Sequence, residues 1–285
     1  MSLRSFVPIA YRKAWRSPKW SFAIVALVTL LCGCFGPVLA VAQGIQKPAP
    51  TPAQTVLLVA AAADLQPVLP ALADAYEKAT GVKVLASFGS SGNLTAQILN
   101  GAPVDLFLGA DFVFPEKLVA AGLADTSSPV PYARGRLVLW TRNDTPFHPL
   151  SLESLLDPRV KTIAIADELH APYGRAAVSA LRFLKLYDRA QPHLVTAENI
   201  AQAGQYVESG NAQLGLISLT LASTAHFKAV GSYVLVPTQA YPEIRQCAVV
   251  LSRSDRRTAA HAFLDWLLTE KVQNQLPAFG LVSVH

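Results

Sequence analysis

The stretch Val59-Ala60-Ala61-Ala62-Ala63-Asp64-Leu65 leads from a short apolar run through small residues into a helical pattern. Similar transitions follow at residues 87–94, 163–174 and 195–200. Each predicts a strand that ends where a helix begins. The first N–H groups of a helix lack intrahelical partners and lie at the positive end of its dipole, so such starts favour a bound anion. The pattern indicates a receptor for a small oxyanion rather than an enzyme.

The first 42 residues have the order of a secretory signal. Five basic residues between positions 4 and 19 precede the apolar stretch Phe22–Leu31 and the small-residue triplet that ends at Ala42. We expect cleavage after Ala42 and an extracytoplasmic, periplasmic destination. A membrane-spanning helix is the alternative, but a bilayer needs about 20 apolar residues and Gly36-Pro37 interrupts this run. Leu31-Cys32-Gly33-Cys34 also resembles a lipoprotein cleavage box, which would place a lipid anchor on Cys34.

Removal of this leader changes the charge of the chain. The full sequence has 24 basic and 19 acidic residues, and the leader contains five of the basic ones and none of the acidic ones. Because 24 minus 5 is 19, the remaining chain is neutral. Nucleic-acid binding usually needs a concentrated basic face, so we expect no nucleic-acid partner. Only Cys247 remains after the leader, which excludes an internal disulfide, and its apolar surroundings predict a buried thiol.

Strand and helix patterns alternate after a proline-containing linker at residues 43–54. This alternation predicts an α/β fold with parallel sheets covered on both faces. Two apolar runs, Arg136–Trp140 and Ala248–Leu251, interrupt the alternation because neither leads directly into a helix. We therefore expect two lobes joined by paired crossovers, with residues 55–132 and 238–285 in lobe 1 and residues 133–237 in lobe 2.

Seven short motifs, in register, resemble the periplasmic molybdate-binding proteins of ABC importers. They cover essentially all of residues 55–285, and they are residues 59–65, 88–94, 101–107 with 110–111, 170–174, 198–200, 214–218 and 241–246. The resemblance implies a type II periplasmic binding-protein fold, in which two α/β lobes close a central cleft on a tetrahedral dianion. It also implies a membrane permease as partner, no cofactor, and molybdate or tungstate as ligand. We expect a monomer.

The resemblance also implies which residues contact the anion. The family's donating serine at the second helix start corresponds to Ser91, and its backbone donors correspond to Tyr173 and Ile200. Its first serine corresponds to Asp64, and a tyrosine that donates in some members corresponds to Ser218. These residues would contact the oxygens of the anion and would not ligate the metal atom directly.

The residues themselves are suited to this chemistry, although each also has a purely structural interpretation. An anion that loses its water needs many oriented donors, and hydroxyl and N–H groups supply them without a counter-charge. Ser91 has such a hydroxyl, as does its neighbour Ser90, but serine is also a common helix N-cap. Tyr173 could offer its N–H or pack its ring between the lobes. Ile200 could offer its N–H while its side chain packs in the core.

Asp64 fits the family pattern least well, because a carboxylate repels a fully ionised anion. Three arrangements are open: the side chain caps its own helix, the carboxyl is protonated, or the carboxylate accepts a proton from the ligand. The third would favour a protonated oxyanion such as hydrogen phosphate. Pro67 and Pro70 predict that the helix after Asp64 starts late or kinks.

Other polar residues favour structural roles. Asp105 and Asp111 flank the strand at Leu106–Leu108, where aspartate usually holds loops through backbone hydrogen bonds. His170 has no Cys or acid cluster at metal-ligand spacing around it, which favours a solvated loop histidine. An exported hydrolase is the alternative of a different class, but the sequence contains no Gly-x-Ser-x-Gly elbow.

Overall fold

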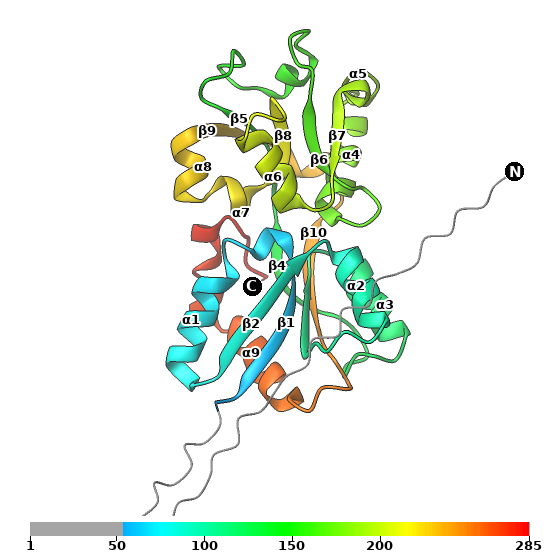
Figure 1. Ribbon diagram of the computed structural model, residues 1–285, viewed down its shortest axis with the longest axis vertical. Coiled ribbons are helices and arrows are strands. Elements are labelled where there is room, and N and C mark those ends of the chain that lie inside the picture. The colour runs from blue at the N-terminus through cyan, green and yellow to red at the C-terminus, as the bar shows by residue number, and fades with distance from the viewer. Residues whose placement is uncertain (1–53, 285) are drawn as a thin grey trace, which may run out of the picture. The chain divides into compact units, whose positions relative to one another are not determined.

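The computed structural model describes residues 54–284. The expected signal segment, its cleavage point after Ala42, the cysteine at position 34 and nearly all of the predicted 43–54 linker lie outside these residues. In the described part, ten strands form two separate five-stranded sheets, each with helices packed against it (Figure 1). Both sheets belong to one compact unit of the chain.

The first sheet has the strand order β2-β1-β3-β10-β4. β1, β2 and β3 are parallel, whereas β10 is antiparallel to both of its neighbours. The strands are β1 (Val56–Ala62), β2 (Lys83–Gly89), β3 (Leu106–Gly109), β4 (Val130–Gly135) and β10 (Ile244–Val250). Its helices are α1 (Leu69–Thr80), α2 (Ser91–Leu99), α3 (Val113–Ala120), α9 (Arg257–Leu267) and α10 (Glu270–Gln273), with 3-10 turns η1 (Ala63–Leu65) and η5 (Leu276–Phe279).

The second sheet has the order β7-β6-β8-β5-β9, and here β5 is the antiparallel strand. Its strands are β5 (Leu137–Arg142), β6 (Ile163–Ala166), β7 (Leu194–Ala197), β8 (Leu214–Ser218) and β9 (Gly231–Leu235). The helices of this lobe are α4 (Pro172–Phe183), α5 (Tyr187–Ala190), α6 (Ile200–Glu208), α7 (Leu219–Ala222) and α8 (Ala225–Val230). Its 3-10 turns are η2 (Leu152–Leu156) and η3 (Gln191–His193), and a further turn, η4 (Thr238–Ala240), lies between β9 and β10.

The chain passes between the two sheets twice. It leaves the first sheet after β4 and enters β5 at once, and it returns from β9 through η4 to β10. Of these four strands, β10 and β5 run antiparallel to their neighbours and make both sheets mixed, where the alternation predicted parallel sheets. The boundary expected between residues 132 and 133 falls inside β4, which pairs with β10 in the first sheet. The sequence patterns did not predict β4.

Turn residues begin and end the helices that cover the first sheet. α1 begins only at Leu69, after η1, and Pro70 occupies its second position, which needs no donated N–H. The late start predicted from the two prolines is therefore confirmed. Gly101 and Gly122 follow α2 and α3 with φ angles of 97° and 69°, in the left-handed region that a residue without a Cβ adopts most easily.

Each lobe has its own apolar core. In the first lobe, one cluster lies on the side of α1 and α9, where Tyr76 and Phe263 pack with ring centroids 4.9 Å apart, and another lies under α2 and α3. In the second lobe, Trp140 packs against Phe227 with centroids 5.1 Å apart. Fully buried aromatic and aliphatic side chains contribute about 2 kcal/mol each, so both lobes are well stabilised.

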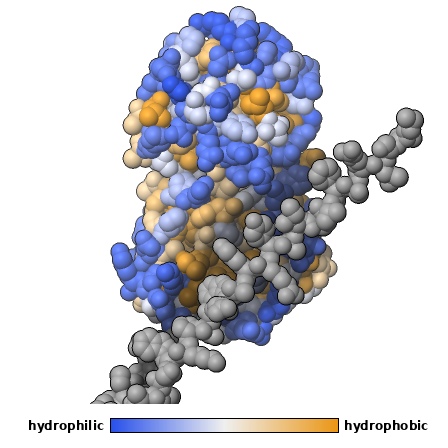
Figure 2. All heavy atoms as spheres, viewed as in Figure 1, coloured by the Kyte–Doolittle hydropathy of each residue, from blue (hydrophilic) through white to orange (hydrophobic). Residues whose placement is uncertain are grey.

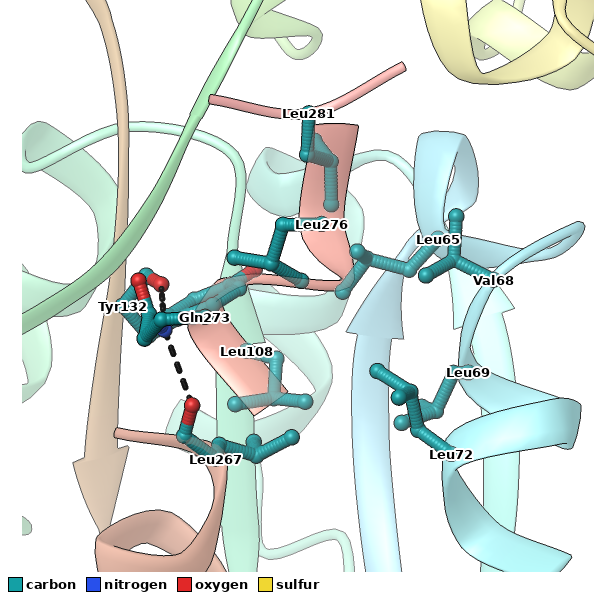
Figure 3. A pocket seen from close by; sticks show the side chains of 10 residues that line it. All are labelled: Leu65, Val68, Leu69, Leu72, Leu108, Tyr132, Leu267, Gln273, Leu276 and Leu281. Atoms are coloured by element: carbon teal, nitrogen blue, oxygen red, sulfur yellow. Dashed lines mark hydrogen bonds between the residues drawn. The ribbon is translucent and has the colours of Figure 1, made fainter. Parts of the chain in front are cut away.

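The first cluster lines an apolar cavity with about 310 Å³ of empty space, part of which is open to solvent (Figure 3). Eight of its ten lining residues are Leu or Val. Leu65 comes from η1, and Val68 and Leu69 come from the start of α1 (Figure 3). The amide of Gln273 donates to the carbonyl oxygens of Leu267 and Tyr132, at 2.8 and 3.0 Å, and so has no free donor for a ligand (Figure 3). An anion would find no hydrogen-bond donors in this cavity.

The visible face of the second lobe is mostly hydrophilic (Figure 2). Within residues 54–284 there is no helix that combines the length and the apolar character needed to cross a bilayer.

Candidate functional site between the lobes

Five of the six predicted contact residues line one cavity between the two lobes. It has about 190 Å³ of empty space, part of which is open to solvent. The first lobe contributes the ends of β1 and β2 and the starts of η1 and α2, and the second lobe contributes the starts of α4 and α6. The lining residues are Ala62, Ala63, Asp64, Gly89, Ser90, Ser91, Ala110, Ala171, Pro172, Tyr173, Asn199 and Ile200. We call this space the interlobe cavity.

Two serines begin α2 at the cavity wall. Ser90 is the N-cap, and its Oγ accepts from the N–H of Asn93 at 3.3 Å. Ser91 is the first helical residue, and its Oγ accepts from the N–H of Ala110 at 3.0 Å. Capping therefore falls to Ser90, not to Ser91. Because an N–H occupies one acceptor site on each oxygen, both hydroxyl hydrogens remain available for an acceptor in the cavity.

Asp64 lies in η1, directly after β1, and is 1 % exposed. Its Oδ2 accepts from the hydroxyl of Tyr173 at 3.1 Å and also from the side-chain amide of Gln246. Its Oδ1 is buried without a hydrogen-bond partner among the described residues. The carboxyl caps no helix, so the capping arrangement considered for Asp64 is wrong: the side chain turns toward β10 and the second lobe instead.

Burial raises the pKa of Asp64 from 3.8 to about 7, although the hydrogen bonds from Gln246 and Tyr173 oppose the shift. The physical cause is the loss of water around the charged form. Burial, and next the negative charge of Asp64, raise the pKa of Tyr173 well above its ordinary value, so that its phenol is neutral near pH 7. Asp64 is thus divided between its acid and carboxylate forms near neutrality.

Tyr173 comes from the opposite lobe, in the first turn of α4. Pro172 begins this helix, so the N–H of Tyr173 has no intrahelical acceptor. Its ring is buried between the lobes, and the phenol reaches Asp64. A Cβ on Gly135 would collide with this hydroxyl, so the glycine at the end of β4 makes room for it. The ring and the N–H thus have separate roles, and the ring is packed as the structural interpretation predicted.

Ile200 is the first residue of α6, and its side chain is buried in the core of the second lobe. Its N–H, like that of Tyr173, is at a helix start without an intrahelical acceptor. The preceding residue, Asn199, caps α6 by accepting from the N–H of Gln202 at 3.0 Å. Three helices of nine or more residues, α2, α4 and α6, therefore begin at the interlobe cavity.

Ser218 does not line the interlobe cavity. It is completely buried at the end of β8, where its Oγ caps α7 by accepting from the N–H of Leu221 at 3.4 Å. The hydroxyl of Thr220 donates to the same oxygen at 2.8 Å. The structure thus gives Ser218 a local structural role as the N-cap of α7.

The remaining predicted structural roles are confirmed. Asp105 accepts from the N–H of Leu58 at 2.7 Å, and Asp111 accepts from that of Phe114 at 3.1 Å. The ring of His170 is half exposed, with Nδ1 2.9 Å from a carboxylate oxygen of Asp167. Cys247 is a buried free thiol.

Three contacts cross directly between the lobes beside the cavity. The N–H of Gly92 donates to the carbonyl oxygen of His170 at 2.8 Å. The amide of Asn93 donates to Glu198 at 3.0 Å. The third contact is an ion pair of Arg175 with Asp111 at 3.2 Å. These contacts hold the lobes together around the cavity.

The cavity wall contains no lysine, arginine or histidine among the described residues, and Asp64 and Tyr173 are its only ionisable side chains. Nor do residues 54–284 contain a cluster of three or more His, Cys, Asp or Glu side chains placed to hold a metal ion. The donors are neutral, and they are hydroxyls and backbone N–H groups. Such a site suits the oxygens of an anion and offers nothing to a bare cation except Asp64.

Sequence reasoning assigned no role to two residues that matter here. Gln246 is fully buried in β10 and donates to Asp64. The signal was available, because a glutamine inside an apolar strand must find a polar partner. Asn199 lines the cavity and caps α6. An asparagine directly before a helical pattern is a typical N-cap, so it too could have been predicted.

A sequence model of a family described as bacterial extracellular solute-binding protein matches residues 57–282. The chain belongs to this family. It is 39 % identical over 223 residues to the molybdate-binding protein ModA of Azotobacter vinelandii, covering 78 % of this chain and 88 % of the relative. It is 34 % identical to ModA of Rhodobacter capsulatus, covering 86 % of this chain and 94 % of the relative.

The solved structures agree with these relatives. The Azotobacter vinelandii periplasmic molybdate-binding protein superimposes with a TM-score of 0.75 at 35 % identity, over 80 % of this chain and 100 % of that one. The resemblance drawn from the seven motifs is confirmed, as is the type II binding-protein fold of two α/β lobes. These relatives carry the names of molybdate-binding proteins and not of hydrolases, so the hydrolase alternative is not favoured.

Proposed function

We propose that this protein binds molybdate, and also tungstate, in the interlobe cavity and delivers it to the membrane permease of an ABC importer. The relatives named above are molybdate-binding proteins, and the chain covers most of their length. The observation that carries the proposal is the convergence of two serine hydroxyls and three helix starts on one cavity without cations. Uncharged donors of this kind can replace the water around a dianion.

The proposed ligand contacts are the hydroxyls of Ser90 and Ser91, the N–H groups of Tyr173 and Ile200, and the carboxyl of Asp64. Ser90 is the N-cap of α2, and Ser91, Tyr173 and Ile200 lie in the first turns of α2, α4 and α6. At these helix starts both the free N–H groups and the helix dipole favour negative charge. Because α2 belongs to one lobe and α4 and α6 to the other, all donors come together only when the lobes are closed.

Closure of the lobes on the anion is the step that would signal loading. Ligand-driven hinge closure is a common transition in two-lobed proteins, and the two crossovers after β4 and after β9 are the hinges available here. A permease that recognises both lobes at once would distinguish the closed receptor from the open one. We propose that the receptor acts as a monomer in the periplasm, after export and cleavage of its leader.

The test is a titration of the purified protein, residues 43–285, with molybdate, tungstate, sulfate and phosphate. A ligand that binds only the folded state stabilises it by about 2.7 kcal/mol at 100 times its Kd, so the melting temperature should rise with molybdate and tungstate. Calorimetry should give one site per chain. If none of the four anions shifts the melting temperature, the proposal is wrong.

Hydrogen phosphate is the second candidate ligand, and one observation favours it. Oδ1 of Asp64 is a buried acceptor with no partner among the described residues, and a protonated oxyanion could donate to it. Phosphate carries such a proton at neutral pH, whereas molybdate does not. Tighter binding of phosphate than of molybdate in the same titration would favour this candidate.

A further inference from the structure

Asp64 is the unusual group of the interlobe cavity, because a carboxylate there would repel the proposed ligand. Two like charges in contact in a site with little water repel each other much more strongly than they do in bulk water. Within residues 54–284, no cationic side chain lines the cavity to offset this repulsion. A dianion and an ionised Asp64 therefore compete for the same small space.

The hydrogen bonds of Asp64 distinguish its two oxygens. Oδ2 already accepts from the phenol of Tyr173 and from the amide of Gln246, so it is the oxygen without the proton in the neutral acid. Oδ1 is buried and has no partner in the described structure. A proton on Oδ1 would have no acceptor within the protein, and an oxygen of a bound anion would supply one.

We propose that Asp64 holds the anion as a neutral carboxylic acid, so that each dianion binds together with one proton. The inference rests on the proposed function, since it concerns the same cavity. The proton comes from solvent, attaches to Oδ1, and is then donated in a hydrogen bond to an anion oxygen. No covalent bond other than this O–H bond forms. Binding of the dianion with one proton adds one negative charge to the cavity, whereas binding beside an ionised Asp64 would add two.

The surroundings of Asp64 favour this arrangement. Burial raises its pKa to about 7, so that the proton is available near neutrality even without ligand. The ionisable groups that face it are the phenols of Tyr173 on α4 and Tyr132 on β4, and burial raises the pKa of both well above the ordinary value. Tyr241, before β10, lies next to Tyr173. None of these groups offers Asp64 a positive charge.

Other ionisable groups lie at the cavity rim and outside its wall. Asp111 is paired with Arg175, and His170 contacts Asp167. These groups could add a pH dependence of their own, so the test needs a variant that removes only the proton site. Asp64→Asn is such a variant, because the amide has nearly the same shape, does not ionise, and can donate an N–H from the position of Oδ1 while its oxygen accepts from Tyr173 and Gln246.

The experiment is calorimetric titration with molybdate between about pH 6 and pH 8.5, in buffers of different ionisation enthalpy that report the protons taken up. The wild-type protein should take up about one proton per molybdate at pH 8.5 and few at pH 6, and its affinity should fall by up to about tenfold per pH unit above pH 7. Asp64→Asn should bind with no such pH dependence and no such uptake. Asp105→Asn is the matched control, because it removes another buried aspartate, one that lies outside the cavity wall and contacts only residues of the first lobe, and it should keep the wild-type proton uptake.

Three results would overturn the inference, and the first two of them would leave the proposed function intact. The first is molybdate binding by the wild type with constant affinity and no proton uptake at pH 8.5. The second is an Asp64→Asn variant that retains the full pH dependence, which would place the proton elsewhere. The third is hydrogen phosphate binding at pH 8.5 more tightly than molybdate and without uptake, since the carboxylate would then act as the acceptor. Failure of the wild type to bind molybdate at any pH would instead contradict the proposed function.

Discussion

Replacement of Ser91 by alanine should weaken molybdate binding and also destabilise the empty protein. The Oγ of Ser91 has two partners in the proposed complex: it accepts from the N–H of Ala110 at 3.0 Å and donates its own hydrogen to the anion. Loss of a hydrogen bond to a charged group costs about 1.5 to 3 kcal/mol, which corresponds to about a 12- to 150-fold higher Kd. The buried N–H of Ala110 also loses its acceptor, which should reduce the free energy of unfolding by about 1 to 3 kcal/mol.

Two measurements separate these effects. Calorimetry well below the melting temperature reports the affinity of folded protein, and urea unfolding without ligand reports the stability. Thr95→Val is the matched control: Thr95 is buried on the same helix, its hydroxyl has no partner in the described structure, and it lies outside the cavity wall. Its affinity should equal that of the wild type. If Ser91→Ala lowers stability but leaves Kd within twofold, Ser91 supports Ala110 only and is not a ligand contact.

Three further predictions follow from the same geometry. Gly92→Ala should weaken molybdate binding by about tenfold in calorimetry, because a Cβ there would lie 2.9 Å from the backbone of His170 and hold the lobes apart. An unchanged Kd would show that closure tolerates the extra carbon. Leu108→Ala should enlarge the apolar cavity of the first lobe and lower the free energy of unfolding, measured in urea, by about 2 to 5 kcal/mol. A loss below about 1 kcal/mol would mean that the neighbouring side chains move in and fill the space left by Leu108. Asp64→Asn should stabilise the ligand-free protein at pH 8, by up to about 4 kcal/mol, and much less at pH 4.

The sign of the last prediction comes from the pKa of Asp64. It is 3.8 in the unfolded chain and about 7 in the folded one, so between these values the folded state binds more protons. Stability from this group is fully present below about pH 4 and is lost as pH rises through about 7. The asparagine variant lacks this loss. A wild-type unfolding free energy that does not fall relative to the variant between pH 4 and pH 8 would contradict the reasoning.

The helix starts around the cavity were predictable because their signals are local. Small or turn-forming residues after an apolar run end a strand, and Ser90, Ser91 and Tyr173 follow such runs closely in sequence. Which of the two serines caps α2 was not predictable, because adjacent serines have the same propensity and only the backbone angles decide between them. β4 was missed because its residues Val130–Gly135 include a proline and an arginine, and the strand forms through pairing with β10, more than 100 residues later in sequence.

The amino-acid sequence alone determined the α/β class, the two-lobed organisation and the family, because periodicity and motifs depend on neighbouring residues. It also determined that the chain after residue 42 has equal numbers of basic and acidic residues. Only the tertiary structure decided the environment of Asp64. Gln246 and Tyr173, which contact it, are 182 and 109 positions away, and they meet it because β10 returns to the first sheet and the second lobe packs over η1. The pKa of a carboxyl depends on the water and the donors around it, and the fold, through contacts distant in sequence, sets both.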